Sequence, residues 1–417
     1  MTDAPVPLPD RVDVVVVGAG LGGLAAAKVV VAADRSVLVL EASDGVGGRV
    51  RTDEVDGFLL DRGFQVVLTA YPELHRQLDV AALDLRAFEP GALVWRNGSA
   101  SVLGDPFRRP RTVVSTALAP VGSLLDKARI ARLRYRLRRA KPAELLRGED
   151  VTTLEALRAD GFSEQIVERF FRPLFSGIQL DPTLSTSRRM FDVIFRSLAA
   201  GDSAVPAAGM GAIPGQLEGA LPSGAVVACT PVATVAAGRV RTTAGDEVAA
   251  AAVVVATDGP AAAGLLRLPA VGSRPVGCVY FAADHAPTDS KLVCLAADGA
   301  GLVANVAVMS NIAPTYAPAG RHLVVAALPG TTDGDLEAEA RRQLSAWWGD
   351  QVDAWRHLRT YRIPHGQPDQ APPFDPKQRV SLGEGLFVCG DHRDTGSIQG
   401  ALYSGRRCGE AVVASLG

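Results

Sequence analysis

The sequence predicts an α/β fold in which a parallel sheet covered by helices is joined to an α+β domain with an antiparallel sheet and a helical insertion. Three observations lead to this prediction: valine-rich runs of strand length, a glycine-rich turn that opens an alanine-rich helix, and a series of short apolar strands in the second half. The 417 residues are enough for one large or two medium domains with a buried core.

The first fifty residues carry the clearest motif. A buried strand is expected at Asp13–Val17, a helix at Leu24–Ala33 and a second strand at Ser36–Leu40. The turn after the first strand has GxGxxG spacing at Gly18, Gly20 and Gly23. In this motif the first glycine makes the tight turn, the second lets the backbone approach a diphosphate, and the third lets helix and strand pack closely.

Two further features complete a Rossmann-like dinucleotide site. The N-terminus of the helix offers unpaired N–H groups and a positive dipole end to phosphates. The acid that ends the second strand can accept hydrogen bonds from ribose hydroxyls. The residues predicted to contact the nucleotide are Gly18, Ala19, Gly20, Leu21, Gly22, Gly23, Glu41 and Ala42.

A second glycine pair, Gly47-Gly48, follows and is succeeded by Arg49, which can neutralise a diphosphate. The run from Glu41 to Thr52 resembles the superfamily of flavin amine oxidases, protoporphyrinogen oxidases and phytoene desaturases. The resemblance implies FAD as the cofactor. No cysteine lies just before the C-terminal motif, where some relatives attach flavin covalently, so the FAD is expected to be held non-covalently.

The same resemblance covers other parts of the chain. It implies that Gly63, Phe64, Gln65 and Val66 pass close to the isoalloxazine ring, and that the backbone of Val232 meets the adenine. At the other end it implies that Asp391, after Gly390, binds the ribityl chain, and that the backbone of Ser397, Ile398 and Gln399 faces the pyrimidine edge. Residues 170–181 and 209–214 resemble a bacterial, desaturase-like branch.

These segments predict a discontinuous FAD-binding domain of residues 1–70, 205–265 and 375–417. The substrate-binding domain is then 71–204, which has a helical pattern, and 266–374. Strands are expected in the latter at Pro275–Ala282, Leu292–Leu295, Leu302–Val308 and Leu323–Ala327, with a helix at Leu336–Trp348. Thr152 to Glu155 form a capping-box pattern. The helically spaced set Met190, Phe191, Ile194, Phe195 and Leu198 indicates core packing more than a pocket lining.

The expected activity is removal of a hydride from an apolar or cyclic organic substrate to flavin N5, as in a dehydrogenase or desaturase. A flavin amine oxidase is the alternative, but Ala282 and Ala283 stand where such enzymes usually carry a lysine, with Lys291 a poor substitute, and Ile398 where they carry an aromatic. A non-enzymatic prenyl-binding escort of the same fold is a remote alternative. Such an escort is expected to have lost the glycines that bind phosphate, and this chain retains them. No side chain is assigned as catalytic, although His365 and His392 are candidates for contact with substrate.

Composition limits the partners. The net charge of −2 offers no basic field for nucleic acid, and no metal-ligand spacing is present. Five cysteines without a CxxC pair, and an N-terminus unlike a signal peptide, indicate a cytoplasmic protein. Residues 127–141 form a basic helix with an apolar stripe at Ile130, Leu133 and Leu137. Such a helix suits peripheral membrane contact, although a solvated helix paired with acids elsewhere is favoured.

Overall fold

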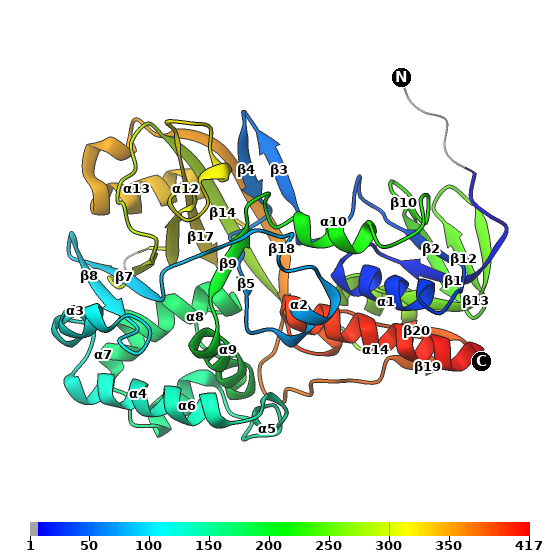
Figure 1. The fold of residues 1–417 in the computed structure, drawn as a ribbon, viewed down its shortest axis with the longest axis horizontal. Coiled ribbons are helices and arrows are strands. Elements are labelled where there is room, and N and C mark those ends of the chain that lie inside the picture. The colour runs from blue at the N-terminus through cyan, green and yellow to red at the C-terminus, as the bar shows by residue number, and fades with distance from the viewer. Residues whose placement is uncertain (1–6, 300) are drawn as a thin grey trace.

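The computed structural model describes residues 7–299 and 301–417 and has two lobes, each built on a large sheet (Figure 1). Residues 1–6, which include half of the N-terminal segment discussed above, lie outside the described residues. The predicted α/β fold class is confirmed, since one sheet is mainly parallel and the other mainly antiparallel.

The first lobe has an eight-stranded sheet whose main path runs β10-β2-β1-β13-β12-β11, with β20 also paired to β13 and β19 to β20. Three distant stretches of chain supply its strands: β1 (Arg11–Val17) and β2 (Val37–Leu40); β10 (Val226–Val227), β11 (Val232–Ala236), β12 (Arg239–Thr242) and β13 (Glu247–Val255); and β19 (Ser381–Gly383) and β20 (Leu386–Val388). Val14 and Val16 pack on one face of the sheet, and Val15 and Val17 on the other. Burial on both faces explains the unbroken valine run.

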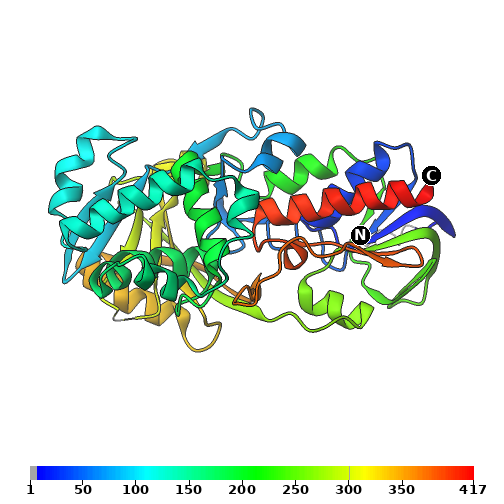
Figure 2. The ribbon, with the colours of Figure 1, turned by 90° about the horizontal axis from the view of Figure 1, so that it is seen from below.

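Helices α1 (Leu21–Val31) and α14 (Ile398–Leu416) lie side by side on this sheet, while α11 (Gly259–Leu266) follows β13 (Figures 1 and 2). Small residues set the close approach of α1 and α14. A Cβ at Gly405 would overlap the carbonyl oxygen of Gly22, and one at Gly409 would press on that of Ala26. The glycines of the C-terminal helix are therefore required by packing.

The second lobe has a seven-stranded sheet in the order β18-β14-β17-β16-β15-β7-β8. Its strands are β7 (Gly91–Arg96), β8 (Ser99–Gly104), β14 (Ser273–Ala283), β15 (Val293–Ala296), β16 (Asn305–Val308), β17 (His322–Pro329) and β18 (Arg356–Pro368). The hairpin β7–β8 comes from the stretch 71–204, which was predicted to be helical. That prediction is wrong for this part, because β7 completes the sheet by pairing parallel with β15.

All four tryptophans of the chain gather beside this sheet, next to α13 (Leu336–Trp348). Trp95 stacks on Trp347 at 5.5 Å between ring centroids and meets Trp348 edge-on, and Trp348 also contacts Trp355. These rings form the core on the face of the sheet that α13 covers.

The rest of the stretch 71–204 is mainly helical, as predicted. Its helices are α2 (Pro72–Gln77), α3 (Val113–Leu118), α4 (Leu124–Arg139), α5 (Pro142–Leu145), α6 (Thr153–Ala159), α7 (Glu164–Ile166), α8 (Arg172–Gln179) and α9 (Arg188–Ala200). Thr152 forms the predicted capping box with Glu155, and Gly161 follows the end of α6 with φ +84°. The stripe Ile130, Leu133 and Leu137 packs inward, in the cluster that also holds α9, so this stripe is not available to a membrane.

Short elements connect the lobes (Figure 1). They are the hairpin β3 (Thr52–Val55) and β4 (Phe58–Asp61), the small sheet of β5 (Val67–Leu68), β6 (Leu85–Ala87) and β9 (Ser203–Pro206), and α10 (Ala212–Glu218). Helix α12 (Met309–Ile312) lies in the second lobe, between β16 and β17. The division into two domains at the expected boundaries stays a prediction.

Candidate functional site

A cavity of about 1170 Å³ runs from the turn after β1 to the helices of the second lobe. Of the residues predicted to bind the nucleotide, all but Ala19, Gly23 and Gln399 line it. The structure therefore brings together segments that are separated by more than 300 residues. The cavity has two regions, which we call the groove, beside β1 and α14, and the arm, between the second sheet and helices α4, α8 and α9.

The glycines of the first turn differ in what surrounds them. Gly18 has φ +103°, and a Cβ at Gly23 would overlap the carbonyl oxygen of Gly18, so the first glycine serves the turn and the last serves packing. Gly20 has ordinary φ and ψ angles (−71°, 176°) and no heavy atom within 4 Å of where a Cβ would lie. Its bare backbone therefore faces open space in the groove.

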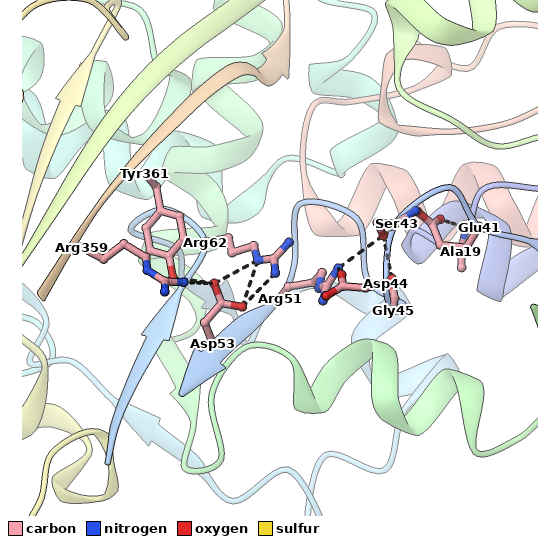
Figure 3. Close-up of polar contacts among 10 residues, drawn as sticks. All are labelled: Ala19, Glu41, Ser43, Asp44, Gly45, Arg51, Asp53, Arg62, Arg359 and Tyr361. Atoms are coloured by element: carbon pink, nitrogen blue, oxygen red, sulfur yellow. Dashed lines mark hydrogen bonds and ion pairs between the residues drawn. The ribbon is translucent and has the colours of Figure 1, made fainter. Parts of the chain in front are cut away.

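Glu41 is held in place by three hydrogen bonds (Figure 3). Its carboxylate accepts from the backbone N–H of Ala19 at 2.7 Å, and from the backbone N–H and the hydroxyl of Ser43 at 2.9 and 2.7 Å. A carboxylate has about four acceptor sites. Glu41, which lines the groove, therefore retains capacity to accept from a ligand hydroxyl.

The second glycine pair lies directly against the first turn. Gly47 donates its N–H to the carbonyl of Ala19 at 2.8 Å, and a Cβ at Gly48 would lie 3.5 Å from the Cα of Gly20. Gly47 and Gly48 have φ of +109° and +58°. The two glycine segments thus present adjoining backbone to one side of the groove.

Arg49 points toward the C-terminal motif. Its guanidinium donates to Asp391 Oδ1 at 2.7 Å and to the carbonyl of Gly366 at 3.0 Å. Burial alone would lower the pKa of Arg49, but the Asp391 carboxylate raises it above its ordinary value. The Arg49 guanidinium therefore stays charged, and its contact with Asp391 joins the N-terminal and C-terminal pieces of the groove.

The N-terminus of α14 also faces the groove. Ser397 caps the helix by accepting from the N–H of Gly400 at 3.0 Å, and both Ser397 and Ile398 line the cavity. Gln399 does not line the cavity, and its side-chain oxygen accepts from the backbone N–H of Glu73 at 3.0 Å.

The segment 61–66 is anchored by the buried carboxyl group of its first residue, Asp61. Asp61 accepts from Thr52 Oγ1 at 2.6 Å, from the N–H of Met210 at 2.9 Å and from the Tyr316 hydroxyl at 2.9 Å. Burial raises the pKa of Asp61 to about 6, while these hydrogen bonds oppose that rise. Asp61 ties the segment that leads to Gly63 to both lobes.

A second anchor lies on the other side of the same segment (Figure 3). Arg62 donates to both oxygens of Asp53, which also accepts from Arg359 at 3.2 Å and from the hydroxyl of Tyr361 at 2.7 Å. Arg359 and Tyr361 belong to β18, so this cluster joins the hairpin β3–β4 to the second sheet. No sequence motif marked Asp53, Arg359 or Tyr361, because they meet Arg62 only through the fold.

The arm is lined mainly by apolar side chains. Its lining includes Phe88, Phe170, Leu174, Ile178, Phe195 and Val293. Its polar members include Asn305, which is 5% exposed and whose buried side-chain oxygen has no hydrogen-bond partner among the described residues. Gly177 makes room for it, since a Cβ there would overlap the Asn305 amide. No sequence pattern marked Asn305. Core packing is favoured over a pocket lining by the spacing of Ile194, Phe195 and Leu198, yet all three also line the arm.

The two candidate histidines do not line this cavity. His365 is exposed and contacts Ser273 Oγ at 2.9 Å, while His392 is buried and burial lowers its pKa. Both border a separate space of about 10 Å³ behind Arg49 and Asp391. The lysine that lines the large cavity is Lys127, which donates to the carbonyls of Ala117 and Ala119.

Comparison with known proteins gives one family. The family model described as flavin-containing amine oxidoreductase matches residues 21–413. The putrescine oxidase of Kocuria rosea is 50% identical over 72 residues, which are 17% of this chain and 15% of that protein. The coproporphyrinogen III oxidase of Mycobacterium bovis is 29% identical over 171 residues, or 39% of this chain and 36% of that protein. These matches thus span well under two thirds of either relative.

Solved structures resemble the whole chain. An oxidoreductase from Methanosarcina mazei has a TM-score of 0.74 at 17% identity, covering 95% of this chain and 100% of the other. A wild-type putrescine oxidase bound to putrescine has a TM-score of 0.71 at 18% identity, covering 97% and 99%. At 17% and 18% sequence identity, the structural similarity establishes the fold alone.

Proposed function

Because the chain belongs to the family of flavin-containing amine oxidoreductases, we propose that it is an FAD-dependent oxidoreductase that removes a hydride from an apolar or cyclic organic substrate. Family membership confirms the resemblance inferred from the motifs and makes FAD the cofactor. The observation that carries the proposal is the continuity of the groove with an apolar arm.

The groove fits FAD in the shape and chemistry of its walls. The open space beside Gly20 and the adjoining Gly47 and Gly48 suit the diphosphate, with the N-terminus of α1 facing it. Glu41 suits the ribose, Val232 the adenine and Asp391 the ribityl chain. Bound FAD supplies the hydride acceptor.

The remaining residues position the ring and the substrate. Gly63 to Val66 and the N-terminus of α14 border the junction of groove and arm, where the reacting carbon would lie. The positive dipole end at the N-terminus of α14 would stabilise negative charge on a reduced flavin ring beside it. The apolar arm excludes water and binds the substrate by its hydrocarbon surface, and Asn305 is a polar side chain in its lining that can hydrogen-bond a polar group of the substrate.

Oxidation of an amine is the second candidate, favoured by the 50% identical segment shared with putrescine oxidase. The arm argues against a small diamine as substrate. Its acids are Glu89 and Asp105, which already pair with Arg109 and Arg134. Ala282 and Ala283 are buried in β14 and Lys291 is exposed and outside the lining, so none of these supplies an amine oxidase lysine. The escort alternative is disfavoured, because the glycines and Glu41 that line the groove are intact.

We place the protein in the cytoplasm, because its five cysteines are unpaired thiols. None of them lines the cavity, which supports non-covalent FAD. Denaturing the holoprotein should release all of the flavin into solution, and flavin retained on the chain would contradict this.

The function is tested by anaerobic bleaching of the protein-bound flavin with three substrate classes: primary amines including putrescine, dispersed polyenes, and porphyrinogens. We expect polyenes or porphyrinogens to bleach the flavin and simple amines to leave it oxidised. Rapid bleaching by amines alone would replace the proposal with amine oxidation. Asn305→Ala should raise the KM of the active compound more than it lowers kcat.

A further inference from the structure

Large apolar side chains are exposed in one short region of the molecule. Nine large apolar residues are exposed in the described part of the chain, and six lie between positions 107 and 125. These six, which we call the mouth patch, are Phe107, Val113, Val114, Leu118, Leu124 and Leu125. Leu118 is the most exposed, at 78%. Scattered exposed leucines need no explanation, but a cluster of this kind marks an interaction surface.

The mouth patch is also the rim of the arm. Phe107, Val113 and Leu124 line the cavity, together with Thr116 and Ala117 of α3. One apolar surface therefore runs from the outside of the molecule to the interior of the arm. Figures 1 and 2 show that α3 and α4 lie at the end of the molecule opposite β19 and the C-terminus of α14.

Helix α4 continues the patch with a mixed surface. Its exposed ridge carries Leu125, Arg132, Tyr135 and Arg139, which share one face of the helix at successive spacings of seven, three and four residues. The guanidinium of Arg139 lies over the ring of Tyr135, 4.1 Å from its centroid. Aromatic rings and long basic side chains beside aliphatic residues are typical of the membrane–water interface.

The charge of this region is strongly positive. Residues 107–141 contain eleven basic residues and one acid, Asp126, which is buried and accepts from Ser123 and Ser163. Five of the basic residues pair with acids: Arg108, Arg109, Arg129, Arg134 and Arg136. The others form no ion pair with any described residue: Arg111, Lys127, Arg132, Arg138, Arg139 and Lys141. This face therefore has a positive charge that is not balanced locally.

We propose that the mouth patch docks on an anionic lipid bilayer, so that the arm takes its apolar substrate directly from the membrane. The aliphatic residues enter the acyl boundary while Arg111, Arg132 and Arg139 meet lipid phosphates. The contact uses a different face of α4 from the stripe predicted from the sequence, since Leu133 and Leu137 are buried and Ile130 is half-buried in the lining of the cavity. Every helix among the described residues is too short or too polar to cross a bilayer. Docking stands independently, whereas substrate delivery rests on the proposed function.

The docking test is sedimentation of the holoprotein with phosphatidylcholine vesicles, with or without phosphatidylglycerol. The test variant is Val114→Ser/Leu118→Ser, and the control is Leu302→Ser/Leu382→Ser, which alters two exposed leucines elsewhere. We expect binding to the anionic vesicles, at least about tenfold weaker for the test variant and unchanged for the control. Binding should also weaken as salt rises. Equal binding of test and control variants, or none to anionic vesicles, would overturn the proposal.

A protein partner is the other occupant to exclude. The molecular mass in solution, measured without lipid, should be the same for wild type and test variant. A wild-type dimer that the test variant abolishes, with no vesicle binding, would assign the patch to a second copy and overturn membrane docking. Unchanged flavin content shows that the test variant is folded.

Delivery is tested with the compound that bleaches the flavin. When this compound is dissolved in anionic vesicles, it should reduce the flavin of the test variant about tenfold more slowly than that of wild type. When it is dispersed in detergent, it should reduce the flavin of both proteins at the same rate. Equal rates in vesicles would overturn delivery while leaving the oxidation intact. If no apolar compound bleaches the flavin, the proposed function fails while vesicle binding still decides docking.

Discussion

Replacing Gly20 with alanine tests whether the open space beside this residue is the diphosphate site. The backbone of Gly20 has angles that alanine adopts freely, and no protein atom lies within 4 Å of the new methyl group. The apoprotein should therefore fold normally and gain about 0.4–1 kcal/mol, because alanine restricts the unfolded chain. In the holoprotein the methyl group would press against FAD.

The size of the effect on FAD follows from overpacking. Forcing one extra carbon into a filled site costs about 1–3 kcal/mol, which is about a 5- to 150-fold rise in Kd. Titration of apoprotein with FAD, followed by flavin fluorescence, measures the Kd. Urea unfolding of the apoprotein measures stability separately.

Two further glycines provide matched controls. Gly215 on α10 also has no atom within 4 Å of a Cβ but lies outside the cavity lining, so Gly215→Ala should leave the Kd of FAD unchanged. A Cβ at Gly23 would overlap the carbonyl oxygen of Gly18, so Gly23→Ala should destabilise the apoprotein itself. An unchanged Kd in Gly20→Ala, or a loss of apoprotein stability like that of Gly23→Ala, would refute the reasoning.

Three other predictions follow from the site. Glu41→Gln should raise the Kd of FAD about 10- to 150-fold, because a charged hydrogen bond worth about 1.5–3 kcal/mol is lost; an unchanged Kd in the same titration would remove Glu41 from the site. Burial raises the pKa of Asp61 to about 6, so its contribution to stability is present below about pH 4 and is lost as pH rises through 6. Wild type should lose about 2 kcal/mol more than Asp61→Asn between about pH 4 and pH 8 in urea unfolding, and parallel profiles would contradict this. Asn305→Leu should raise the free energy of unfolding of the apoprotein by about 1 kcal/mol, because it removes an unsatisfied buried oxygen; a lower urea midpoint would show that the oxygen has a partner.

Local signals predicted the first lobe well. The valine run, the glycine spacing and the acid at position 41 lie within thirty residues, and each depends on neighbours in the chain. The predicted strands at Asp13–Val17 and Ser36–Leu40 correspond to β1 and β2 within two residues, and the helix Leu336–Trp348 matches α13 at both ends. The FAD-binding roles of individual residues stay predictions.

The second lobe was harder to predict from the sequence, because its strands pair with strands that are distant in the chain. Strand β7 pairs with β15, about 200 residues later, and no pattern within 71–104 reveals that partner. The hairpin itself has a signal: Asn97 and Gly98, both with positive φ, form the turn between two short runs. Strand β18 lacks clear alternation because most of its residues are only partly buried.

The arm could not be predicted from periodicity. The spacing of Ile194, Phe195 and Leu198 defines an inward face of α9, but only the fold decides whether that face meets protein or a cavity. Asn305 joins the arm because Gly177, on a different element, leaves room for its amide. The mouth patch was missed for a similar reason, since exposure of Leu118 and Leu124 depends on what the rest of the chain leaves uncovered.

The grouping of all four tryptophans in the second lobe gives the protein two built-in optical reporters. Indole emission reports only on the sheet beside α13, whereas the emission of bound FAD would report on the groove. Unfolding by heat or by urea can then be followed by indole emission and flavin emission in the same sample. Loss of the flavin signal before the indole signal would mean that the first lobe opens while the second stays folded.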